Sequence, residues 1–153
     1  MKNGLKVLVV ENHKLPRVRV QLSIDNPPIM EGDKAGLSAL TASMMGKGSK
    51  NIPKDEFYEE VDFLGATVFI GDQSAFASSL SKYFPRILEL MADAALNPNF
   101  LPEEFDKEKE KIITAIKSEE KDVSAVADRV QLALAYGKNH PFGEFMTEET
   151  VNN

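Results

Sequence analysis

The sequence contains no cysteine and only two histidines, His13 and His140. Without cysteine the chain forms neither disulfide bonds nor thiolate metal sites, and its cysteine usage therefore indicates no compartment. No run of about 18 apolar residues, the length that crosses a bilayer as a helix, occurs in the chain. The N-terminus enters a strand-like pattern without a cleavage site of small residues, so we expect neither a membrane span nor a signal peptide.

Positive charge is also scarce, with 18 Lys and Arg against 24 Asp and Glu, a formal net charge of −6 and a pI near 5.0. Affinity for nucleic acid depends mainly on Lys and Arg side chains that neutralise phosphates. This balance therefore argues against a nucleic-acid partner. At 153 residues the chain is long enough for one compact domain with its own core, and we do not expect a second full domain.

Segments with β-branched or alternating apolar residues come in two pairs, and each pair predicts an antiparallel hairpin. The four expected strands are residues 5–10, 17–24, 66–70 and 74–81. Helical apolar stripes lie between and after these pairs, and several begin with proline and acidic residues in the first turn. The expected helices are about 12 residues before Gly48, then 53–65, 84–97, 101–122 and 123–136, with a further start at 147–151. This order predicts an α+β domain with an antiparallel sheet.

The first expected helix, within "GLSALTASMMGKGS" (residues 36–49), has two unlike faces. At about 100° per residue, the expected core stripe is Leu37, Leu40, Thr41 and Met44. The opposite face carries only small residues, namely Ala39, Ala42, Ser43 and Gly46. A solvated helix face normally carries Lys, Glu or Gln, so we expect this face to meet something close. It either packs against a neighbouring backbone or forms a cleft wall without functional side chains.

This stretch resembles the insulinase and pitrilysin family of zinc peptidases, which includes the mitochondrial processing peptidase. The family reads roughly G-x-x-H-x-x-E-H-M-x-x-K-G-T, and its inverted H-x-x-E-H motif supplies two zinc ligands and a general base. The residues that match this frame are Gly36, Met44, Lys47, Gly48 and Ser49. The three catalytic positions of the family fall on Ala39, Ala42 and Ser43.

The resemblance covers essentially the whole chain, through "IPKDEFYEEVDFLGATV", "ILELMADAALNPNFLPEEFDKEKEKIITAI" and "AYGKNHPFG". In the family, a glutamate seven residues beyond the E of an E-(R/K) pair is the third zinc ligand. Here Glu108 retains the first of these glutamates, and Ala115 occupies the ligand position. Alanine ligates no metal, and the Ser43 hydroxyl stays protonated at neutral pH. The resemblance therefore implies an inactive homologue without a zinc cofactor.

The two histidines and the charged residues of 101–122 lie outside the positions of the H-x-x-E-H motif and indicate a function less clearly than those positions do. His13 lies in a polar turn and is expected to face solvent, whereas His140 precedes Pro141 and is expected to pack locally. A zinc site made by both histidines and a carboxylate stays open, although two distant segments would have to meet. We interpret the charged surface of 101–122 as solvated ion pairs, with Glu108 alone facing the former catalytic site. That surface comprises Glu108, Glu110, Glu119, Glu120, Lys107, Lys109, Lys111 and Lys117.

An edge strand of the family holds extended peptides by β-augmentation, in which backbone groups supply affinity. The corresponding residues are Thr67, Val68, Phe69 and Ile70. Phe69 and Ile70 replace what is commonly Asn-Ala, so this edge has diverged as well. Ordinary sheet packing of Val68 and Ile70 is the alternative interpretation.

The resemblance implies that residues 1–153 form the N-terminal part of one peptidase domain, with helices on one face of its sheet. A sheet edge left unpaired predicts self-association. The implied function is a non-catalytic subunit that pairs with an active H-x-x-E-H peptidase and helps to bind peptide. The alternatives are a stand-alone peptide-binding module or scaffold, and an active zinc peptidase with ligands outside the motif. Related bacterial pairs are often exported, which favours a periplasmic location.

Overall fold

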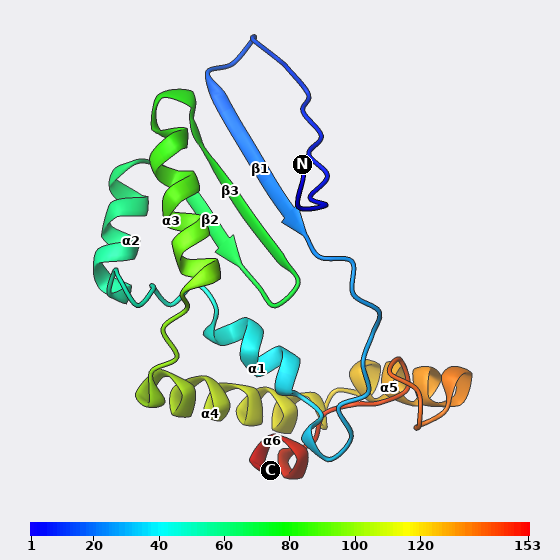
Figure 1. Cartoon of the computed structure of the whole chain (residues 1–153). Coiled ribbons are helices and arrows are strands. Elements are labelled where there is room, and N and C mark those ends of the chain that lie inside the picture. Colours follow the sequence, from blue (N-terminus) through cyan, green and yellow to red (C-terminus); the bar gives the residue numbers. More distant parts are fainter.

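The computed structural model describes all 153 residues and contains one three-stranded sheet and six α-helices (Figure 1). The strands are β1 (Arg17–Ser23), β2 (Thr67–Ile70) and β3 (Ser74–Leu80). Their order is β1-β3-β2, and both pairs are antiparallel. The helices are α1 (Leu37–Met44), α2 (Lys54–Phe63), α3 (Phe84–Leu96), α4 (Pro102–Glu119), α5 (Val123–Tyr136) and α6 (Glu148–Asn152), with short 3-10 turns η1 (Gly32–Lys34) and η2 (Ser81–Tyr83). The predicted α+β class with an antiparallel sheet is therefore confirmed.

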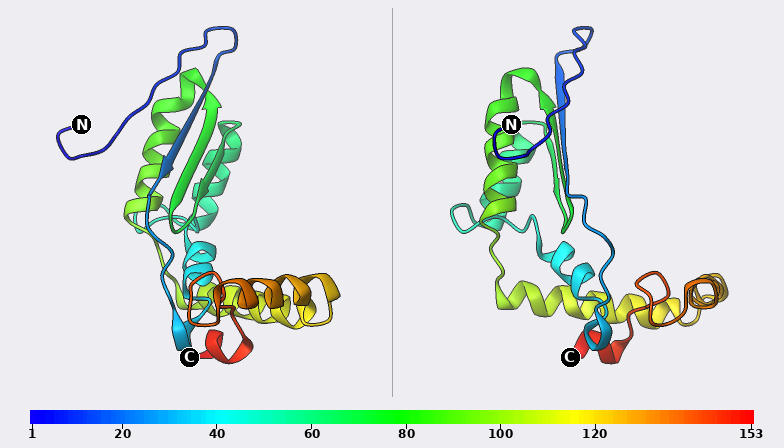
Figure 2. Two further views of the ribbon diagram at one scale, coloured as in Figure 1. Left: turned by 90° about the vertical axis from the view of Figure 1, so that its right-hand side faces the viewer. Right: turned by 45° about the vertical axis from the view of Figure 1, so that its right-hand side comes forward.

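One face of the sheet carries the hydrophobic core. Along β3, Ala75, Ala77 and Ser79 are buried, whereas the residues between them are half-buried, as the alternation of side chains along a strand requires. The register places Val20 of β1 and Val68 of β2 opposite Ala77, on the same face. Helices α2 and α3 cover this face, as the nearly edge-on right-hand view of Figure 2 shows. The buried core residues are Phe57, Val61, Ile70, Ala75, Ala77, Ile87, Leu90, Met91 and Ala94.

The other four helices form a second group beyond one end of the sheet (Figure 1). Helix α1 packs against α4, and α6 packs against both α4 and η1. Leu40 and Met44 of α1 and Ile116 of α4 are buried in this group, whereas α5 has no buried residue. Of the six helices, none is both long and apolar enough to cross a membrane.

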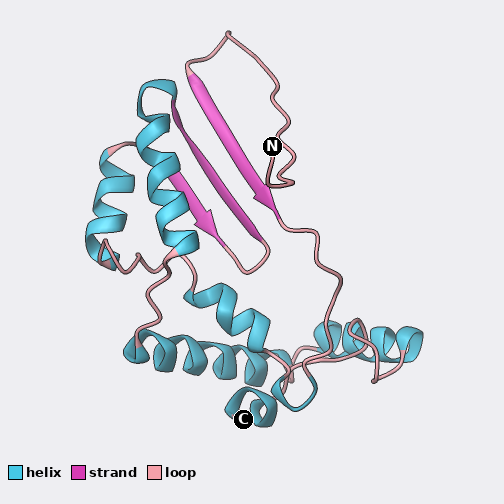
Figure 3. Ribbon diagram, viewed as in Figure 1, coloured by secondary structure: helices cyan, strands magenta, loops and turns pink.

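The expected strand at residues 5–10 is not formed, so the prediction of a first hairpin is wrong (Figure 3). Strand β1 pairs with β3 alone, and the side chains of Leu8 and Val10 are 94% and 93% exposed. β-branched residues form a strand where a partner backbone and an apolar surface receive them, and neither is present here. Residues 11–16 also lack the Asn-Gly or Asp-Gly type of turn that fixes a hairpin. The second hairpin and the helices lie within a few residues of the predicted positions.

Candidate functional site

A glutamate from the preceding loop holds the start of α1. No residue at the helix end caps it with its own side chain. Instead, the Glu31 carboxylate accepts hydrogen bonds from three backbone amides, those of Gly36, Leu37 and Ser38, at 2.6, 3.0 and 2.7 Å. Burial raises the pKa of Glu31, but the hydrogen bonds from Ser38 and the two preceding amides outweigh burial and hold the pKa below its ordinary value. A negative charge is therefore fixed at the positive end of the helix dipole.

Two contacts from the C-terminal segment fix this loop. The Glu144 carboxylate accepts hydrogen bonds from the amides of Glu31 and Gly32, at 2.9 and 2.7 Å. A Cβ atom added to Gly36, whose φ is 110°, would lie 2.9 Å from Cγ2 of Val151 in α6. Gly36 is thus required both by its backbone conformation and by the close approach of α6.

Three residues of the predicted small-residue face, Ala39, Ala42 and Ser43, lie on α1, whereas Gly46 lies in the turn after the helix ends at Met44, with a φ of 74°. All four residues are half-buried. The Ser43 hydroxyl donates a hydrogen bond to the Leu40 carbonyl at 2.8 Å, so it is occupied within its own helix. A Cβ atom at Gly46 would lie 3.7 Å from Cβ of Ile70 in β2. The end of this face near Gly46 therefore packs against the sheet, as one of the two interpretations required.

The other end of the face, at Ala39, lines a cavity of about 420 Å³. Its walls come from the loop before α1, the β2–β3 turn, the facing parts of α4 and α5, and the segment after α5. Glu119 and Arg129 line the cavity and form an ion pair at 2.6 Å, and Ser38 and Gln73 are further polar residues of the wall. This volume falls within the roughly 300–1,000 Å³ of ligand sites, but the wall is more polar than is usual for them, with 5 hydrophobic residues among 14. Both interpretations of the small-residue face thus apply, each to one end.

The other predicted catalytic positions do not line this cavity. Ala42 and Ser43 lie further along α1, and Ala115 is exposed on the surface of α4. Ala39 is therefore the one position of the four that the structure places in a cavity wall next to ionised groups.

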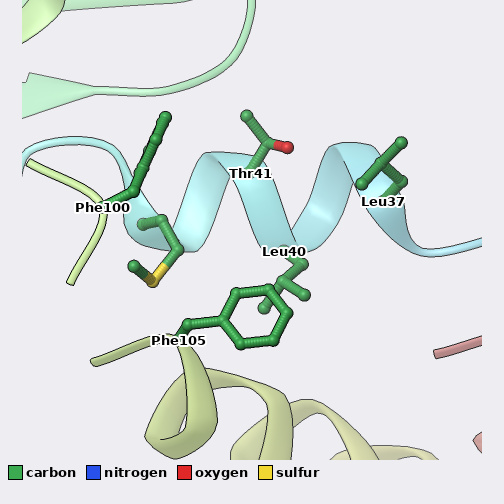
Figure 4. Close-up of a pocket in the computed structure, with 6 residues that line it drawn as sticks. Leu37, Leu40, Thr41, Phe100 and Phe105 are labelled. Atoms are coloured by element: carbon green, nitrogen blue, oxygen red, sulfur yellow. The ribbon is translucent and has the colours of Figure 1, made fainter. Parts of the chain in front are cut away.

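The apolar stripe of α1 faces α4 across a groove of about 270 Å³ (Figure 4). Leu40 and Met44 are buried there, and the ring of Phe105 points toward Leu40. The groove is lined by Leu37, Leu40, Thr41, Met44, Phe100 and Phe105. The expected core stripe is correct at Leu40 and Met44, which are buried, and wrong at Leu37, which is 54% exposed.

Glu108 connects α4 to the residues that follow α1. It is 7% exposed, and its Oε1 atom lies 2.7 Å from Nζ of Lys111 and 3.0 Å from Nζ of Lys47. Hydrogen bonds from Lys111 and then from Lys47 hold the pKa of Glu108 below its ordinary value, against the effect of burial. The retained glutamate is therefore ionised and paired with two cations, rather than free to act on a ligand.

The turn after α1 depends on Gly48. Its φ is 84°, and a Cβ atom there would lie 2.7 Å from two backbone atoms, the Ile52 carbonyl oxygen and the Lys54 nitrogen. No side chain fits this position, since backbone atoms cannot move aside as a flexible side chain does.

Ser49, which follows, is 2% exposed and anchors this turn to α3. Its hydroxyl oxygen accepts hydrogen bonds from the amides of Asn51 and Ile52 and donates one to the Asp93 carboxylate. The hydrogen bonds from Ser49 and then Asn97 lower the pKa of Asp93. The sequence pattern shows Gly48-Ser49 only as a stop signal, because the partner of Ser49 lies 44 residues away.

The two histidines lie apart from these groups. His13 is exposed and lies 3.5 Å from the Glu11 carboxylate, as expected for a solvated turn. His140 stacks on Tyr136 with ring centroids 5.3 Å apart and accepts a hydrogen bond from the Phe142 amide, which confirms local packing. No three His, Cys, Asp or Glu side chains gather in a way that could hold a metal ion.

The predicted peptide-binding strand, Thr67–Ile70, is β2, and it lies at an edge of the sheet. Its inward residue Ile70 is buried and Val68 is half-buried, so the ordinary packing role is confirmed for both. Phe69 is 56% exposed on the other face. Capture of a peptide by this edge and self-association through it stay predictions.

Comparison with known proteins identifies the family. The sequence profile described as Insulinase (Peptidase family M16) matches residues 6–146. The chain belongs to the insulinase family. The match includes α1 with its small-residue face, α4 with Glu108 and the cavity at Ala39. No curated protein matches the chain in sequence.

Several solved structures share the fold of the chain. An inactive domain of an M16 peptidase from Pseudomonas fluorescens is 22% identical with a TM-score of 0.76, over 92% of this chain and 35% of that one. A protease from Helicobacter pylori is 18% identical with a TM-score of 0.77, over 92% and 36%. A conserved protein from Enterococcus faecalis V583 is 16% identical with a TM-score of 0.64, over 90% and 36%. The chain thus spans about a third of the length of these structural neighbours.

Proposed function

We propose that this chain is a non-catalytic domain of the insulinase family, which pairs with an active zinc peptidase and helps to hold its peptide substrate. The observation that carries the proposal is the set of residues at the family's four zinc and base positions: Ala39, Ala42, Ser43 and Ala115. Hydrolytic zinc sites need three protein ligands and an open position for water. The residues present do not fit a zinc ion, and no hydrolytic step follows from them.

The surroundings of these positions support the same proposal. The Ser43 hydroxyl is bonded within α1, Ala115 faces solvent, and the retained Glu108 is neutralised by Lys47 and Lys111. The glutamates that line the cavity with Ala39 are engaged elsewhere: Glu31 and Glu144 accept hydrogen bonds from backbone amides, and Glu119 pairs with Arg129. The similar domain from Pseudomonas fluorescens is itself described as inactive.

The cavity at Ala39 supports a role in holding peptide. Position 39 holds a zinc ligand in the family. Here Ala39 lines an open cavity, and the ion pair of Glu119 with Arg129 lies in the same cavity wall. A peptide side chain that enters the cavity meets alanine instead of metal, so it is held without being cut. The domain is then a binding surface, and the catalytic zinc belongs to its partner.

Metal content and peptidase activity of the purified full-length protein test the loss of catalysis. We expect less than about one zinc ion per ten chains after dialysis, and no hydrolysis of a generic peptide mixture beyond that of a buffer blank. Stoichiometric zinc together with chelator-sensitive hydrolysis would overturn the proposal, because it would require ligands outside the family motif.

A stand-alone peptide-binding module is the second candidate, favoured by the free outer edge of β2, which offers backbone groups without any second protein. The two candidates differ in one measurable respect. A non-catalytic subunit forms a complex of defined stoichiometry with its active sister, whereas a stand-alone module binds peptides equally well without one.

A further inference from the structure

One face of the sheet carries no helix. In the right-hand view of Figure 2 both α2 and α3 lie on the same side of the strands, and the opposite side is open. On β1 the residues opposite the buried positions of β3 point inward, so Arg17, Arg19 and Gln21 point outward onto the open face. The same alternation places Phe69 of β2 and Phe76 of β3 on it.

This open face combines aromatic rings with positive charge. Phe69 and Phe76 are directly opposite each other in the β2–β3 register, and Phe69 is 56% exposed. The guanidinium of Arg19 lies 5.0 Å from the centre of the Phe76 ring, a cation–π contact. This contact places the Arg19 guanidinium over the sheet, and its N–H groups that do not face the ring remain available as donors.

The two arginines have no acidic partner. Each ion pair of the chain involves other residues, so neither Arg17 nor Arg19 is neutralised. Residues of all three strands line a hollow of about 440 Å³ in this sheet, and none of them is a carboxylate. Its lining residues are Arg17, Val18, Arg19, Thr67, Phe76 and Ser78. In a chain with a formal net charge of −6, two unpaired arginines over one hollow give this face a local positive charge.

We propose that this face binds an extended acidic peptide segment, in which a carboxylate meets Arg17 and Arg19 and a neighbouring apolar side chain packs on Phe69. Arginine pairs with carboxylates through two parallel N–H···O bonds, which gives geometric selectivity as well as attraction. The exposed ring of Phe69 supplies the apolar contact that a free anion would not use. A nucleic acid is disfavoured, because the overall negative charge repels a polyanion and two arginines neutralise few phosphates.

This inference rests on the proposed role in holding peptides, and it adds the charge class of the peptide. It does not depend on pairing with an active sister, so the two ideas can fail separately.

Titration calorimetry on the full-length protein with three seven-residue peptides tests it. The peptides share a Phe-rich sequence and carry two Glu, two Gln or two Lys at the same positions. We expect the Glu peptide to bind about tenfold more tightly than the Gln peptide and the Lys peptide to bind least. That difference is expected to shrink with added salt, as exposed charge pairs do.

Two double variants with the same change in net charge separate the site from a general charge effect. Arg17→Gln with Arg19→Gln should remove the roughly tenfold preference for the Glu peptide and leave the Gln peptide unchanged. Lys121→Gln with Lys138→Gln, at two exposed lysines that form no ion pair, should retain the preference. Circular dichroism confirms that each variant is folded before it is titrated.

Equal affinity for the Glu and Gln peptides, or equal loss of preference in both double variants, would overturn the inference while the peptide-holding role stands. If none of the three peptides binds, both the inference and that role fail. Stronger binding of a single-stranded oligonucleotide than of the Glu peptide, abolished in the arginine variant, would reassign the face to nucleic acid.

Discussion

Replacement of Glu31 tests whether the start of α1, and with it the wall of the Ala39 cavity, depends on one carboxylate. Glu31→Ala removes the acceptor for three backbone amides at 2.6 to 3.0 Å. Loss of a helix N-cap costs about 0.5–2 kcal/mol, and loss of a negative charge at the positive end of a helix about 0.3–1 kcal/mol. Since Glu31 is only half-buried, water replaces part of the loss, and we expect a decrease of about 2 kcal/mol in the free energy of unfolding.

Chemical denaturation at pH 7 measures this decrease, and thermal unfolding should show a midpoint lower by about 4–8 °C. Glu31→Gln retains one acceptor oxygen and loses the charge, so it should cost about half as much. The matched control is Glu59→Gln, at an exposed residue of α2 that forms no ion pair, which should change stability by less than about 0.5 kcal/mol.

The contribution of Glu31 to the free energy of unfolding is also expected to depend on pH. The folded protein holds the pKa of Glu31 below its ordinary value of 4.5, so its charge stabilises the fold above that value. This contribution is lost as the pH falls through the lowered pKa, and the difference between wild type and Glu31→Gln should shrink in the same range. A difference that is absent at pH 7, or that grows toward acid, would refute the reasoning.

Three further predictions concern the elements around α1. Gly48→Ala should destabilise the protein by more than about 2 kcal/mol in chemical denaturation because its Cβ meets backbone atoms at 2.7 Å, whereas Gly65→Ala, with nothing within 4 Å, should cost about 1 kcal/mol; equal costs would contradict the packing argument. A double-mutant cycle of Ser49→Ala and Asp93→Asn should show a coupling energy of about 1–3 kcal/mol, and additive losses would show that their hydrogen bond adds no stability. Leu40→Ala, at a residue 6% exposed in the α1–α4 groove, should lower the free energy of unfolding by about 2–5 kcal/mol, and a loss below about 1 kcal/mol would mean that this groove contributes little.

The sequence predicted the helices and the second hairpin because each has a local signal, such as an apolar stripe, a proline at the start or a Gly-Asp turn. It failed at residues 5–10, where Leu8 and Val10 have strand propensity without a partner. Whether a strand forms depends on backbone groups elsewhere in the chain, which no local pattern contains.

The site was predictable to a similar extent. The alanines at positions 39, 42 and 115 can be read directly against the family motif, and the structure adds that only Ala39 lines a cavity. The supports of the site were missed, because each joins distant residues: Glu144 to Glu31, and Asp93 to Ser49. A carboxylate or a hydroxyl in a loop has no periodicity from which its partner could be inferred.

We propose above that this domain is the non-catalytic subunit of a zinc peptidase. Affinity purification of the tagged full-length protein from its native cells tests this proposal most directly. Quantitative mass spectrometry of the eluate should find an insulinase-family relative with an intact H-x-x-E-H motif at near-equal amount, and the purified pair should cleave peptides in a chelator-sensitive manner. Recovery of the protein without any such relative, in extracts where one is expressed, would contradict the account.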